Sequence, residues 1–115
     1  MTETFGLKPE VIDKTHKVFG HHPEIHSVII YGSRAKGTNR EGSDIDLTLT
    51  GSISFSVLRE IEDELDELLL PYSFDLSIYE DLGHEALLDH IRRVGKIFYE
   101  RRTDSPAATI DDLST

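Results

Sequence analysis

Residues 28–50, VIIYGSRAKGTNREGSDIDLTLT, decide the fold of this chain. Val28 to Tyr31 is an apolar run typical of a central strand that is covered on both faces. Asp44 to Thr50 alternates polar and apolar residues, as a half-buried strand does. The segment between them, 32–43, is rich in Gly, Ser, Asn and charge. This composition predicts a loop, within which we expect one short helical turn at 33–36.

The flanking segments predict further helices and strands around this stretch. Helical spacing predicts a helix that has Pro9 in its first turn and stops at Gly20. A second helix should be capped by Ser54 and ended by Pro71. A third strand at 73–79, a helix at about 83–94 and a short strand at 96–99 follow. The side chains expected to face the core from the last two helices are Phe55, Leu58, Ile61, Leu65, Leu68, Leu69, Leu87, Leu88, Ile91 and Val94.

The predicted order is α-β-α-β-α-β-α, which indicates an α+β (mixed α/β) fold. We expect a small mixed sheet of three to four strands with helices packed on it. One face of two strands stays polar, and this face carries Asp44, Asp46 and Asp75.

Composition and charge narrow the classes of function. The chain has 115 residues, a net charge of -10 and no cysteine. This excludes a disulfide framework and disfavours direct nucleic-acid binding. Neither a membrane span nor a signal peptide is evident, so we expect a soluble, cytoplasmic protein. One domain is predicted over 1–102, followed by a flexible tail over 103–115.

The aspartates form the first half of a candidate site. Asp44 and Asp46 are two apart on a strand, so their carboxylates project from the same face. Like charges this close repel unless a cation bridges them, and carboxylates on a rigid strand suit Mg²⁺. Asp75 would join them if its strand lies beside that of Asp46. Three such carboxylates could hold two metal ions about 3.5–4 Å apart.

A Gly-Ser turn beside clustered cations forms the second half. Gly32 allows a sharp turn and lets a phosphate approach the backbone, while Ser33 offers a hydroxyl and a backbone N–H. Arg34, Lys36 and Arg40 crowd the same loop. Each of these cations could instead simply offset nearby acids. Together, acids and cations suggest a nucleoside triphosphate bound between metal ions and basic groups.

These motifs match a known family. Gly32-Ser33-Arg34-Ala35-Lys36-Gly37, followed by Ser43-Asp44-Ile45-Asp46-Leu47, resembles the Gly-Ser and Asp-x-Asp signature of the nucleotidyltransferase superfamily that includes DNA polymerase β. The short length and the Phe74-Asp75-Leu76 strand resemble its minimal nucleotidyltransferase (MNT) branch. The resemblance implies a polymerase β-like nucleotidyltransferase fold.

The resemblance also implies an activity and a partner. Gly32 and Ser33, with Arg34 and Lys36, would contact the triphosphate of ATP or another NTP. Asp44, Asp46 and Asp75 would bind two Mg²⁺ ions, and Asp75 could help to deprotonate the acceptor. Members of this branch are paired with HEPN-domain ribonuclease toxins, and some act as antitoxins by adenylylating a tyrosine of the toxin.

Two alternatives to this activity stay open. The chain could be a non-catalytic antitoxin that neutralises a HEPN partner by forming a complex. It could also be a small-molecule nucleotidyltransferase of the antibiotic-modifying kind, although no acceptor-binding second domain is evident.

Two further patterns have simpler interpretations. The acidic run at 60–67 is expected to solvate the outer face of its helix, with a docking surface for a basic partner as the alternative. His21-His22 has no second pair at metal-ligand spacing. We therefore expect this histidine pair to lie in a surface turn.

Overall fold

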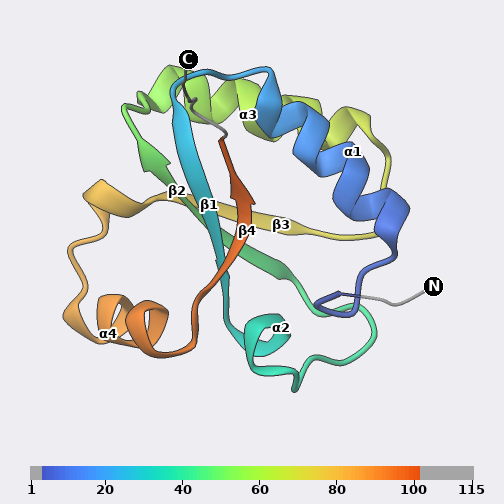
Figure 1. Cartoon of the computed structure of the whole chain (residues 1–115), viewed down its shortest axis with the longest axis vertical. Coiled ribbons are helices and arrows are strands. Elements are labelled where there is room, and N and C mark those ends of the chain that lie inside the picture. Colours follow the sequence, from blue (N-terminus) through green and yellow to red (C-terminus); the bar gives the residue numbers. More distant parts are fainter. Residues whose placement is uncertain (1–3, 102–115) are drawn as a thin grey trace, which may run out of the picture.

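The computed structural model describes residues 4–101. The predicted flexible tail at 103–115 lies outside these residues. The elements are α1 (Pro9–Gly20), β1 (Ile25–Tyr31), α2 (Ser33–Lys36), β2 (Ile45–Gly51), α3 (Phe55–Glu67), β3 (Phe74–Ile78), a 3-10 turn η1 (Tyr79–Asp81), α4 (Glu85–Val94) and β4 (Lys96–Glu100). The predicted order is confirmed, including the short helix at 33–36 and the final strand (Figure 1).

The four strands form one mixed sheet in the order β3-β2-β1-β4. β1 is antiparallel to β2 and to β4, whereas β2 and β3 run parallel. The parallel pair is joined through α3, because parallel strands need a long crossover connection. Figure 1 shows α1 and α3 together on one side of the sheet and α4 on the other.

Strand register separates an apolar face from a polar face. Paired residues on neighbouring strands share a face. Ile30 pairs with Leu47, which pairs with Leu76, and this row belongs to the buried core together with side chains of α1 and α3 such as Phe19 and Ile61. The next row, which projects from the opposite face, begins with Tyr31 on β1. The polar face is therefore the face turned away from α1 and α3.

The structure confirms the predicted start of α3 but corrects two of its predicted core residues. The predicted Ser54 cap is confirmed, because its hydroxyl accepts a hydrogen bond from the Val57 N–H at 3.2 Å. However, Phe55 is 70% exposed and Leu69 is 88% exposed, so neither belongs to the buried stripe. Leu69 lies beyond the end of the helix with a φ of 55°, which takes it off the helical period before Pro71 is reached.

The last helix covers only part of the polar face. Of the four side chains predicted to point inward from α4, only Ile91 is buried, and the other three are half-buried. Gly95 lies against Ile91 and Ile29, so α4 packs over β1 and leaves β2 and β3 more open. Among residues 4–101, no helix is long and apolar enough to cross a bilayer.

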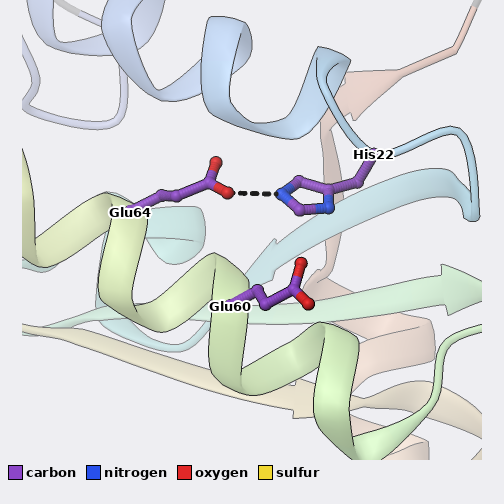
Figure 2. Close-up of side chains that lie close together, drawn as sticks. All are labelled: His22, Glu60 and Glu64. Atoms are coloured by element: carbon purple, nitrogen blue, oxygen red, sulfur yellow. Dashed lines mark hydrogen bonds and ion pairs between the residues drawn. The ribbon is translucent and has the colours of Figure 1, made fainter.

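The histidine pair before β1 differs from the expectation. His21 is exposed, as a surface turn predicts, but His22 is buried. The prediction is wrong for His22 because α3, which is distant in sequence, packs beside this turn (Figure 2).

Candidate active site

One row of side chains across three strands forms the centre of the polar face. Asp46 on β2 pairs with Tyr31 on β1 and with Asp75 on β3. The prediction that the strand of Asp75 lies beside that of Asp46 is therefore confirmed. Asp44 immediately precedes β2 and is exposed, as is Asp75, whereas Asp46 is partly buried. The three aspartates thus gather at one region of the open sheet face.

Electrostatic repulsion acts within this row. Burial raises the pKa of Asp46 above its ordinary value, and the charges of Asp75 and Asp44 raise it further. His90 and Arg34 oppose this rise. Burial also raises the pKa of Tyr31, with added contributions from Asp75 and Asp46. The site therefore disfavours its own negative charge unless a cation compensates for it.

The three aspartates fit a divalent cation in chemistry. Their donors are carboxylate oxygens on neighbouring strands, the ligand type that Mg²⁺ prefers. The carboxylates of the three aspartates are not all close enough together to form a compact ligand set. Within residues 4–101, the group of potential ligands whose atoms all lie within 4.8 Å of one another is His22, Glu60 and Glu64.

Gly32 brings the backbone of the turn close to Asp46. It precedes α2 with a φ of 77° and a ψ of -157°, a conformation that is essentially restricted to glycine. A Cβ atom at this position would overlap Asp46 Oδ2 and would lie 3.3 Å from Asp46 Cγ. The Gly-Ser turn and the Asp-x-Asp strand are thus in contact, as a shared site for phosphate and metal requires.

His90 on α4 belongs to this site, although sequence patterns gave no reason to select it. Its Nε2 accepts a hydrogen bond from the Gly32 N–H at 3.2 Å. Its ring meets the Tyr31 ring edge to face, with centroids 6.2 Å apart. A lone polar residue on an amphipathic helix is an ordinary pattern, so only the packing of α4 on β1 reveals this contact.

The basic residues of the loop occupy different environments. Arg34 is 3% exposed, and its guanidinium donates to the carbonyl of Ser43 at 2.9 and 3.2 Å and to that of Phe5 at 2.9 Å. It therefore anchors the loop that leads into β2, and the predicted triphosphate contact would require these bonds to break. Lys36 and Arg40 are exposed. Their predicted contacts with phosphate are sterically available.

Comparison with known proteins identifies the family of this chain. The profile of the family described as "Polymerase beta, Nucleotidyltransferase" matches residues 13–104, which is most of the chain. The chain therefore belongs to the polymerase β nucleotidyltransferase family, and its mixed sheet is the polymerase β-like fold. No curated protein matches the sequence.

Several solved structures share the fold. One is a toxin-antitoxin with AMP-PNP, at 20% identity and a TM-score of 0.64 over 79% of this chain and 74% of that chain. Another is the toxin-antitoxin MntA-HepT, at 16% identity and 0.60 over 82% and 74%. A third is a tri-AMPylated Shewanella oneidensis HEPN toxin in complex with MNT antitoxin, at 17% identity and 0.58 over 80% and 71%. At these identities the likeness establishes the fold.

Proposed function

We propose that this chain is an Mg²⁺-dependent adenylyltransferase that transfers AMP from ATP to a tyrosine hydroxyl of a partner HEPN toxin, and so acts as an antitoxin. The observation that carries this proposal is the row formed by Asp46 and Asp75, with Asp44 beside it and Gly32 packed against it. This arrangement places adjacent carboxylates beside a Gly-Ser turn on the polar face of the sheet.

The proposed roles follow from the positions of the residues. Asp44, Asp46 and Asp75 would hold two Mg²⁺ ions, which neutralise the phosphates and the charge that develops during transfer. Gly32 and Ser33 would contact the triphosphate through the turn.

The proposed reaction is an in-line displacement at phosphorus. The acceptor oxygen forms a bond to the α-phosphorus, while the bond from this phosphorus to the bridging oxygen breaks and pyrophosphate leaves. The proton of the acceptor hydroxyl passes to the carboxylate of Asp75. This aspartate is exposed and lies on β3, an edge strand of the sheet.

Access to the site supports a protein acceptor. β3 is an edge strand, and Asp75 on it is exposed, so a side chain of a second protein can approach the row from this edge. The neighbours in fold include a toxin-antitoxin with AMP-PNP and an AMPylated HEPN toxin with its antitoxin, which supports ATP as donor and a HEPN protein as acceptor.

Radiolabel transfer tests this proposal. The chain is incubated with its partner, Mg²⁺ and ATP labelled at either the α- or the γ-phosphate. We expect the partner to be labelled from α-labelled ATP alone, and the label to be lost with Asp46→Asn or Asp75→Asn. Asp66→Asn, which alters an exposed acid on α3, is the matched control and should retain transfer. Transfer from γ-labelled ATP, or full transfer by Asp46→Asn, would contradict the proposal.

The same variants separate the rival functions. If Asp46→Asn still neutralises the toxin in cells as well as the unaltered chain, the chain acts by forming a complex. If the label appears on a small molecule and never on protein, the acceptor is not a HEPN toxin.

A further inference from the structure

A second group of potential metal ligands lies away from the aspartates. His22 Nε2 is 3.1 Å from Glu64 Oε2, although the two residues are 42 positions apart in the sequence. Glu60 supplies a third oxygen, and one ligand atom from each residue lies within 4.8 Å of the others. Figure 2 shows these three side chains pointing toward one another. We call them the His22 cluster.

The His22 cluster joins two elements that pack on the apolar face of the sheet. Glu60 and Glu64 are one helical turn apart on α3, so both carboxylates lie on the same face of the helix. His22 follows α1 in the turn that leads into β1. The aspartate row projects from the opposite face of the sheet, so the two groups are separate sites.

Hydrogen bonds fix the backbone of His22, and burial and Glu64 restrict its imidazole ring. The His22 N–H donates to the Phe19 carbonyl at 3.1 Å, and the His22 carbonyl accepts from the Ile25 N–H at 3.0 Å and from the Arg101 guanidinium at 2.7 Å. His22 is only 7% exposed. A buried, fixed nitrogen donor facing two carboxylates loses little freedom when it binds an ion.

The charges of the His22 cluster are not balanced. Two carboxylates at this helical spacing repel each other, and within residues 4–101 the imidazole pairs with Glu64 alone. Glu60 is exposed and forms no ion pair in that part of the chain. A divalent cation would relieve the repulsion and would bring Glu60 to the same centre as the other two ligands.

The donor set indicates the kind of cation. Imidazole nitrogen with carboxylate oxygen suits Zn²⁺ and similar transition metals, whereas Mg²⁺ is bound through oxygen. Zn–N and Zn–O bonds of about 2.1 Å place tetrahedral ligands roughly 3.4 Å apart. The 3.1 Å between His22 Nε2 and Glu64 Oε2 is close to this spacing, and the ligand atoms of all three residues lie within 4.8 Å of one another.

We propose that His22, Glu60 and Glu64 form a Zn²⁺ site that ties α3 to the turn between α1 and β1, with water as the fourth ligand. This site is separate from the aspartate row, which lies on the opposite face of the sheet.

Zinc titration of the tag-free protein tests this site, by calorimetry and by competition with a chromophoric chelator. We expect one Zn²⁺ per chain, with affinity unchanged by millimolar Mg²⁺. His22→Ala, Glu60→Gln and Glu64→Gln should each weaken binding at least about 100-fold, since loss of a ligand exceeds the effect of losing an outer partner. Co²⁺ substituted at the site should show the visible absorption of tetrahedral coordination.

Matched variants distinguish this site from other acids and from misfolding. His21→Ala changes the exposed neighbouring histidine, Glu67→Gln changes an exposed acid on the same helix, and Asp46→Asn changes the aspartate row. All three should retain zinc affinity. Glu60→Gln leaves the bond between His22 and Glu64 intact, so it should stay folded by circular dichroism. The proposal would be overturned if the unaltered chain bound no zinc. It would also be overturned if Glu60→Gln left the zinc affinity unchanged, or if Asp46→Asn abolished zinc binding.

Discussion

Replacement of Gly32 by alanine tests the contact between the Gly-Ser turn and the aspartate row. The φ of 77° and ψ of -157° of Gly32 should destabilise an alanine by about 1–3 kcal/mol. For a domain of this size, such a loss lowers the melting temperature by roughly 4–12 °C. In addition, the new Cβ would overlap Asp46 Oδ2, so the Asp46 carboxylate must move.

The movement of Asp46 should affect activity more than stability. Displacement of a reacting or metal-binding group by about 1 Å commonly reduces turnover about 100-fold. We therefore expect Gly32→Ala to retain a cooperative thermal transition and to lose about 100-fold in label transfer. The stabilisation that Mg²⁺ with ATP gives to the unaltered chain should also be lost.

Gly37 provides a matched control for this substitution. It too has a positive φ, of 80°, but no atom lies within 4 Å of its added Cβ. Gly37→Ala should therefore lose about 1–2 kcal/mol of stability and keep most of its activity. Equal activity of Gly32→Ala and Gly37→Ala at a temperature where both are folded would refute the reasoning.

Three further substitutions probe the surroundings of the site. Arg34→Ala should destabilise the fold by about 2–4 kcal/mol in urea unfolding, because buried carbonyls lose charged donors, whereas exposed Arg40→Ala should change stability by less than about 0.5 kcal/mol. His90→Ala leaves the Gly32 N–H without its acceptor and should lose about 0.5–1.5 kcal/mol, with smaller losses for His90→Gln. The pKa of Asp46 is raised in the folded state, so the unfolded chain loses this proton at a lower pH than the folded chain does. The free energy of unfolding therefore falls as the pH rises above the ordinary aspartate pKa. Without metal, Asp46→Asn should therefore gain stability relative to the unaltered chain between acid and neutral pH, and an unchanged difference across that range would contradict the shift.

Local patterns were sufficient to predict the central part of the site. The alternation of Asp44 to Thr50 fixes which side chains share a face, and the adjacent strand with the same alternation places Asp75 on that face. Gly32 was selected because a sharp turn directly after a buried strand favours glycine, and its φ of 77° is a conformation that favours glycine. The shared face of the aspartates depends on strand periodicity and Gly32 on local turn chemistry, and both are visible in the sequence.

Contacts between distant elements were not predictable. Arg34 was expected to contact a phosphate. Its guanidinium instead donates hydrogen bonds to the carbonyls of Phe5 and Gly6, which lie in a turn distant in the sequence. His90 contacts Gly32 because α4 packs on β1, and His22 contacts Glu64 because α3 packs beside α1. No sequence spacing connects either pair. Exposure of Leu69 follows from a single left-handed residue after α3, which a hydrophobic pattern does not encode.

Anomalous diffraction from crystals with Mn²⁺ and a non-hydrolysable ATP analogue tests the central geometry most directly. We predict manganese peaks within coordination distance of Asp44 and Asp46 and beside Asp75, with the triphosphate over the Gly32-Ser33 turn. Nucleotide bound elsewhere, or manganese absent from these three carboxylates while present at His22, Glu60 and Glu64, would contradict the account.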